Sequence, residues 1–152
     1  MSKIILAFGL PGSGKTTFCK HLIQEMKEIS MVHLNADEIR AQYNDWDFSM
    51  EGRIRQAKRM RDEADKQDSE YILCDFVCPI DKVRRELFKD CYTVFLNTIN
   101  EGRFDDTNKI FEYPQLDTVN FEIHDFGKIK YSAHVISAIL QYQLFAFGLP
   151  SS

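Results

Sequence analysis

The sequence predicts a three-layer α/β domain with a mainly parallel, five-stranded sheet. Three observations favour this fold. Short apolar runs alternate with segments of helical periodicity along the 152 residues. A glycine-rich loop, residues 9–16, lies directly between the first apolar run and the first helical segment. No repeat, linker or shift in composition divides the chain, so we expect residues 1–152 to form a single domain.

Five short runs predict the strands. Residues 4–8 are continuously apolar, as in a parallel strand that is buried on both faces, whereas the last run alternates between apolar and polar residues. The strand candidates are residues 3–8, 31–34, 70–74, 92–96 and 119–123. Their alternation with helical segments favours a mainly parallel sheet.

Helical periodicity covers most of the segments between the strands. The helix candidates are residues 16–29, 38–43, 49–66, 81–88 and 131–147. Ser49 is the expected N-cap of the arginine-rich helix that follows it. Residues 98–115 are polar and show no convincing period, and residues 99–115 are a candidate lid.

The loop at residues 9–16, Gly-Leu-Pro-Gly-Ser-Gly-Lys-Thr, matches the phosphate-binding pattern G-x-x-x-x-G-K-[ST]. Its glycines let backbone N–H groups close on phosphate oxygens, and the next helix points its N-terminus at the anion. Lys15 adds a charge for the β- and γ-phosphates, and the Thr16 hydroxyl can ligate Mg²⁺. The motif therefore predicts ATP and Mg²⁺ as cofactors. The predicted nucleotide-binding residues are Gly9, Pro11, Gly12, Ser13, Gly14, Lys15, Thr16 and Thr17.

Carboxylates follow the second and third strand candidates, at the edge where parallel sheets bind ligands. Asp37 could take a proton from an acceptor hydroxyl or hold Mg²⁺ through water, although Asp is also a favoured helix N-cap. Asp75 ends an apolar strand as a Walker-B aspartate does, and a cap or surface turn is its alternative. Thr16, Asp37 and Asp75 are thus the predicted metal-binding residues.

Arginines and aromatic residues near the same edge predict an acceptor site. Arg40 and Arg53 could hold an anionic acceptor by bidentate contacts, or lie on solvated helix faces. Phe48 and Phe76 could stack on a ring, and Lys109 is a candidate lid cation. Trp46 could also stack on a ring, and Arg103 is a second candidate lid cation. The predicted catalytic residues are Lys15, Asp37 and Arg40.

On these residues the chain resembles the adenylylsulfate kinases, P-loop kinases that phosphorylate the ribose 3′-hydroxyl of adenosine 5′-phosphosulfate. The segments that carry the resemblance are residues 9–17, 35–40, 47–53 and 75–79, and it extends over roughly residues 3–96. In place of the lid segment of that family, residues 102–111 look like the lid of short, phage-type relatives.

The resemblance implies a P-loop kinase fold with ATP and Mg²⁺ at residues 9–17. It also implies that Asp37 is a base or metal-shell residue and that Arg40, Arg53 and Phe76 lie at the acceptor. Gln56 stands near the position of a family asparagine that follows the arginine. The predicted acceptor-binding residues are Asp37, Arg40, Phe48, Arg53, Gln56, Phe76, Val77 and Lys109.

Three functions are compatible with these residues. The first is an ATP-dependent phosphotransferase that moves the γ-phosphoryl group of ATP to a hydroxyl of a small nucleotide, with adenylylsulfate as the leading acceptor. The second is a nucleic-acid hydroxyl kinase, acting on 5-hydroxymethylpyrimidines in DNA or on polynucleotide 5′-hydroxyls. That function predicts a basic strip along residues 53–61. The third is a nucleotide-binding switch without catalysis.

Composition limits the cellular context. A net charge of −4 gives no global electrostatic reason to bind nucleic acid or an anionic membrane. We expect no signal peptide and no membrane span. The four cysteines lack zinc or redox spacing, which favours buried, reduced thiols and a cytoplasmic location. His33 is expected to pack in the sheet rather than to act in catalysis. Aromatic residues on the last helix, Tyr142, Phe145 and Phe147, would permit a homodimer.

Overall fold

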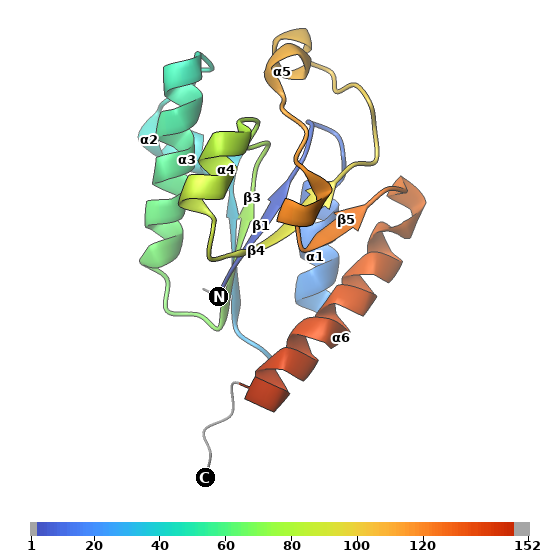
Figure 1. Cartoon of the computed structure of the whole chain (residues 1–152). Coiled ribbons are helices and arrows are strands. Elements are labelled where there is room, and N and C mark those ends of the chain that lie inside the picture. The colour runs from blue at the N-terminus through green and yellow to red at the C-terminus, as the bar shows by residue number, and fades with distance from the viewer. Residues whose placement is uncertain (1–2, 148–152) are drawn as a thin grey trace.

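A computed structural model describes residues 3–147 and has the expected architecture, an entirely parallel five-stranded sheet with helices on both faces (Figure 1). The strands are β1 (Ile4–Phe8), β2 (Met31–Asn35), β3 (Tyr71–Asp75), β4 (Tyr92–Leu96) and β5 (Phe121–Ile123). They lie in the order β2-β3-β1-β4-β5. All five strand predictions are confirmed, because each apolar or alternating run becomes a strand of this sheet.

The sheet separates two hydrophobic cores. On one face, Ile5 and Leu73 pack with Phe18 of α1 (Lys15–Glu25) and Leu140 of α6 (Ile129–Phe147). The other core lies beneath α2 (Ala36–Tyr43), α3 (Met50–Asp65) and α4 (Asp81–Leu87), and Met60 of α3 belongs to it. Alternate residues of β1 belong to opposite cores, which explains why this strand is apolar throughout.

One α-helix was not predicted. Residues 98–115, which lack a clear period in the sequence, contain the short helix α5 (Asp105–Ile110), which lies beyond the carboxyl ends of the strands (Figure 1). Asp105 and Asp106 occupy its first turn, where negative charge is favoured. Six residues are too few to display a helical period, so sequence periodicity did not reveal it.

Several smaller expectations were also tested. Ser49 is the N-cap of α3, and its side chain accepts a hydrogen bond from the Gly52 N–H, as predicted. All four cysteines are buried. Within residues 3–147, no helix is both long enough and apolar enough to cross a bilayer. Tyr142 is exposed on α6, whereas the side chains of Phe145 and Phe147 lie outside the described part of the structure.

Candidate active site

The glycine-rich loop connects β1 to α1. Gly9, Gly12 and Gly14 all have positive φ. Gly14 is the N-cap of α1, with a φ of 100°, and provides no side-chain cap. The first N–H groups of α1 therefore have no partner within the helix and remain available for an anion. The Ser13 N–H is an exception among the loop amides, because it donates to the Leu10 carbonyl over 3.1 Å.

Lys15 folds back onto this loop. Its Nζ donates to the Leu10 carbonyl oxygen at 3.0 Å. Burial lowers the pKa of Lys15 from 10.5 to about 8, although the carboxylates of Asp75 and Asp37 act in the opposite direction. The amine is thus held close to the loop and to two carboxylates, by a single neutral hydrogen bond that phosphate oxygens could replace.

Asp75 lies at the carboxyl end of β3 and is only 2% exposed. One of its oxygens, Oδ2, accepts hydrogen bonds from Thr16 Oγ1 at 2.7 Å and from Asn35 Nδ2 at 3.2 Å. The same oxygen lies 2.9 Å from His33 Nε2. Burial by itself raises the pKa of Asp75, but the hydrogen bonds from His33 and Thr16, together with the electrostatic attraction of His33 and Lys15, leave the pKa below its usual value. Asp75 is therefore a buried carboxylate.

Asp37 lies in the first turn of α2 and is exposed. It is not the N-cap, which was the alternative considered from the sequence. That position belongs to Asn35, whose side-chain oxygen accepts hydrogen bonds from the N–H groups of Asp37 and Glu38. Its side chain is not used in capping, and Asp37 is one of the residues that line the cavity described next.

A cavity of about 800 Å³ lies at the carboxyl ends of the strands, between the glycine-rich loop and residues 103–107. A volume of this size is in the range of ligand sites. Of the predicted site residues it is lined by Pro11, Gly12, Gly14, Lys15, Thr16, Thr17, Asp37, Phe48, Arg53, Asp75, Phe76 and Val77. A second cavity, of about 680 Å³, lies between α4 and residues 114–120 and contains none of them.

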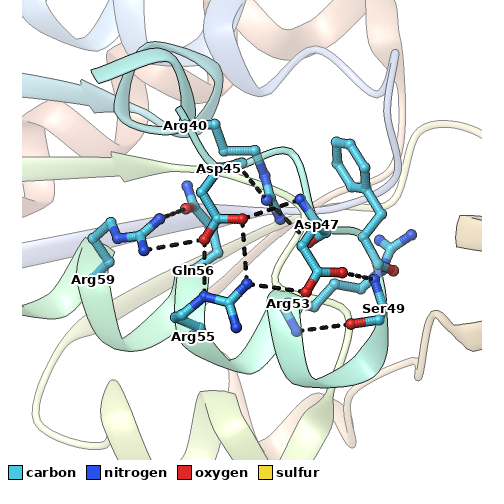
Figure 2. Close-up of polar contacts among 10 residues, drawn as sticks. Arg40, Asp45, Asp47, Ser49, Arg53, Arg55, Gln56 and Arg59 are labelled. Atoms are coloured by element: carbon cyan, nitrogen blue, oxygen red, sulfur yellow. Dashed lines mark hydrogen bonds and ion pairs between the residues drawn. The ribbon is translucent and has the colours of Figure 1, made fainter. Parts of the chain in front are cut away.

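One wall of the first cavity is the loop of residues 44–49. Two arginines hold this loop from within (Figure 2). Arg40 donates to the carbonyl oxygens of Asp45 and Asp47, and Arg53 donates through Nε to the carbonyl oxygen of Phe48. Arg53 also reaches α5, where it lies 3.3 Å from both a carboxylate oxygen of Asp106 and the hydroxyl of Thr107. The side chain of Arg53 thus joins this wall to α5.

The other arginines of α3 are engaged in ion pairs, several of which Figure 2 shows. Arg55 bonds to Asp45 at 2.8 Å and to Asp47 at 3.0 Å, and Arg59 bonds to Asp45 at 3.1 Å. Hydrogen bonds from Ser49 and Arg55 lower the pKa of Asp47 to about 2. These acidic partners neutralise Arg55 and Arg59, two of the cations in the basic strip that a nucleic-acid kinase would need along residues 53–61.

Five predicted residues do not line the cavity as it is described. Gly9 and Ser13 belong to the glycine-rich loop but are buried and do not line the cavity. Arg40 is 4% exposed and donates hydrogen bonds to backbone carbonyls in the loop of residues 44–49. Gln56 is also buried and donates to the carbonyl oxygen of Ala36, while Lys109 is exposed on α5. From the candidate lid, Arg103 lines the cavity and Lys109 does not.

Several lining residues were absent from the predicted set. Asn35 ends β2, caps α2 and donates a hydrogen bond to Asp75. Exposed aromatic side chains also line the cavity, namely Trp46, Phe104 and Phe126. Phe126 approaches Gly14 so closely that a Cβ added to this glycine would lie 3.2 Å from its ring. Asn35 could have been recognised from its position at the end of a strand, but nothing in the sequence brings Phe126 near Gly14.

Comparison with known proteins agrees with this fold. A family profile described as an AAA domain matches residues 4–78. No curated protein sequence gives a match. The chain is similar in structure to the APS kinase CysC of Mycobacterium tuberculosis in complex with AMPPNP and APS, with a TM-score of 0.74 at 19% identity over 92% of this chain and 98% of that chain.

Two further solved structures are similar. Shikimate kinase from Acinetobacter baumannii in complex with shikimate has a TM-score of 0.61 at 20% identity, covering 93% of this chain and 95% of that chain. A gluconokinase from Sinorhizobium meliloti 1021 has a TM-score of 0.57 at 13% identity, covering 93% and 94%. The chain therefore has the α/β fold of P-loop kinases, as predicted.

Proposed function

We propose that this chain is an ATP-dependent phosphotransferase that moves the γ-phosphoryl group of ATP to a hydroxyl group. The observation that carries the proposal is that the glycine-rich loop, Asp37 and Asp75 line one cavity. Phosphoryl transfer requires positioning and charge stabilisation more than covalent help from the protein. The kinases with similar folds, which act on APS, shikimate and other small molecules, support the same chemistry.

The residues of the chain have distinct parts in this proposal. The uncapped N–H groups of α1 bind the phosphates, and Lys15 exchanges the Leu10 carbonyl for phosphate oxygens. Asp37, which is exposed at the cavity, orients the acceptor hydroxyl and takes its proton. Thr16, Asp37 and the second carboxylate oxygen of Asp75, Oδ1, offer oxygen atoms, which are the ligands that Mg²⁺ prefers. Bound Mg²⁺ would neutralise charge on the phosphates.

For the acceptor, we propose a small nucleotide, with adenylylsulfate first. The resemblance to adenylylsulfate kinases over residues 3–96 supports this choice. Phe48, Phe76 and Trp46 line the cavity, where flat aromatic side chains could pack against a base. The ion pairs of Arg55 and Arg59 disfavour a nucleic-acid acceptor, since a polynucleotide needs unpaired cations for its phosphates. A cytoplasmic location is part of the same proposal.

The test is ATP consumption by the purified protein in the presence of Mg²⁺ and a panel of acceptors. The panel contains adenylylsulfate, nucleosides, nucleoside monophosphates, shikimate, gluconate, 5-hydroxymethylated DNA and 5′-hydroxyl DNA. We expect turnover with adenylylsulfate, lost in Lys15→Ala. Turnover with DNA alone would overturn the proposed acceptor but not the chemistry. Nucleotide binding without turnover on any acceptor would favour the non-catalytic switch.

A further inference from the structure

We infer that His33 is a positioning residue, which fixes the Asp75 carboxylate so that Asp75 orients the Thr16 hydroxyl for the metal of a bound nucleotide. The inference rests on the proposed function, and it assigns a role to a strand residue that the sequence suggested was mere packing. It starts from three contacts to a single atom. Thr16, His33 and Asn35 all meet Oδ2 of Asp75, at 2.7, 2.9 and 3.2 Å.

The contacts determine which atom carries each hydrogen. A carboxylate can only accept hydrogen bonds, so His33 must present Nε2–H to Asp75. For the same reason the hydroxyl of Thr16 must donate its hydrogen. Three donors leave no room for a further ligand on Oδ2, because each carboxylate oxygen has about two acceptor sites. Oδ2 thus works as a hydrogen-bond acceptor and not as a direct metal ligand.

The direction of the Thr16 hydroxyl follows from this arrangement. A hydroxyl has one hydrogen and two lone pairs. Because Thr16 donates its hydrogen to Asp75, the lone pairs of its oxygen point away from Asp75. Thr16 lines the cavity in the first turn of α1, beside the loop that would hold phosphates. Residues that hydrogen-bond to a metal ligand, as Asp75 does to Thr16, orient that ligand, and their loss typically weakens metal affinity 10- to 100-fold.

The sheet register explains why His33 can reach Asp75. β2 pairs with β3 so that Asn35 is opposite Asp75 and His33 is opposite Leu73, two residues earlier. Residues two apart on a strand share a face, so His33 and Asn35 point the same way as Asp75. His33 is largely buried, with 19% of its side chain exposed, and Asp75 is the hydrogen-bond partner that the structure assigns to it. The imidazole is therefore placed to hold Asp75.

The experiment measures nucleotide binding rather than turnover. A fluorescent, non-hydrolysable ATP analogue is titrated at increasing Mg²⁺ concentration into the wild type, His33→Leu and His33→Gln. We expect His33→Leu to raise the Mg²⁺ concentration for half-maximal binding about 10-fold or more. His33→Gln, whose side-chain amide offers a donor near the position of Nε2, should restore it to within about 3-fold of the wild type, because it regains the contact on which the effect depends.

Cys19→Ala is the matched control, because Cys19 is buried beside the same cluster and its sulfur lies within 4.8 Å of the ligand atoms of His33 and Asp75. It should leave the Mg²⁺ dependence unchanged. Circular dichroism and thermal unfolding check that each variant folds, and His33→Ala replaces His33→Leu if the latter does not fold.

Two outcomes overturn the inference and one overturns its premise. Unchanged Mg²⁺ dependence in His33→Leu would show that the imidazole does not position Asp75. Equal losses in His33→Leu and His33→Gln would mean that the ring matters for packing alone. If the wild type shows no Mg²⁺-dependent nucleotide binding, the proposed function fails and takes the inference with it.

Discussion

The guanidinium of Arg40 lies 4.3 Å from the centroid of the Phe48 ring. Arg53 approaches the same ring, at 5.5 Å, and donates to the Phe48 carbonyl. Cations from α2 and α3 therefore hold Phe48 in the wall of the cavity. The arrangement gives Arg40 a structural role that differs from the catalytic role predicted from its sequence motif.

The first prediction separates these two roles of Arg40. Arg40→Ala should lower the free energy of unfolding by about 3 kcal/mol, because it removes hydrogen bonds from a buried, charged donor to two carbonyls. It should also raise the KM for the acceptor about 10-fold while kcat falls less than about 3-fold. Denaturant unfolding and steady-state kinetics measure both, with the exposed Arg85→Ala as control. A fall in kcat with normal stability and KM would favour the catalytic role.

The second prediction concerns the packing of the same loop against α3. A Cβ at Gly52 would lie 2.2 Å from the carbonyl oxygen of Asp47, so Gly52→Ala must displace the loop. We expect a stability loss of about 1–3 kcal/mol and a higher KM for the acceptor, with the Kd for ATP little changed. Gly127→Ala is the matched control, because its Cβ would come no closer than 3.4 Å to another residue. Wild-type stability in Gly52→Ala would contradict the close packing of the loop against α3.

The third prediction concerns Lys15. Lys15→Ala should reduce kcat/KM at least about 100-fold, because the ammonium group stabilises charge that develops on the transferred phosphoryl group. Steady-state kinetics test the effect, and Lys20→Ala, an exposed lysine on the same helix, should retain activity. A near-normal kcat in Lys15→Ala would refute the role.

The fourth prediction concerns Asp37. Asp37→Asn should lower kcat about 100- to 10,000-fold, the range expected for loss of a general base, while the Kd for ATP changes less than about 3-fold. The neighbouring, exposed Glu38→Gln should behave as the wild type. If ATP affinity collapsed while kcat held, Asp37 would be a binding residue and not a base.

The fifth prediction follows from the pKa of Lys15, which burial lowers to about 8 in the unliganded protein. Phosphate charges favour the ammonium form, so binding should raise this pKa and take up a proton near pH 8.5. As the pH rises from about 7.5 to 9.5, a growing share of the protein must first be protonated, and the affinity should fall. Calorimetry in buffers of different ionisation enthalpy measures the uptake. It should vanish in Lys15→Ala, and uptake that persists there would come from another group.

Local patterns predicted most of the fold. The apolar runs became β1, β3 and β4 because strands buried on both faces need apolar residues almost throughout. The phosphate-binding loop was predictable because its glycines and Lys15 act over a few consecutive residues. Helix α5 was missed, since its six residues are too few to show a repeating pattern, and the burial of Thr107 within it depends on tertiary contacts.

The site was predicted less completely, and Arg40 and His33 show why. The motif Asp37-x-x-Arg40 indicated that both residues face the acceptor, but in α2 only Asp37 lines the cavity, while Arg40 turns to the loop of residues 44–49. His33 was expected only to pack. His33 and Asp75 are 42 positions apart in the chain, and only the pairing of β2 with β3 brings them into contact.

The sequence by itself determined the order of the strands and of the longer helices, the anion-binding loop and the chemical types of residue at the strand ends. These depend on neighbouring residues, whose spacing is set by the backbone. The tertiary structure alone decided which charges remain available. Asp45 and Asp47 neutralise Arg55 and Arg59, whereas Asp37 stays exposed at the cavity. Such pairing depends on distances of a few ångströms between separate elements, because ion pairs and hydrogen bonds act only at short range.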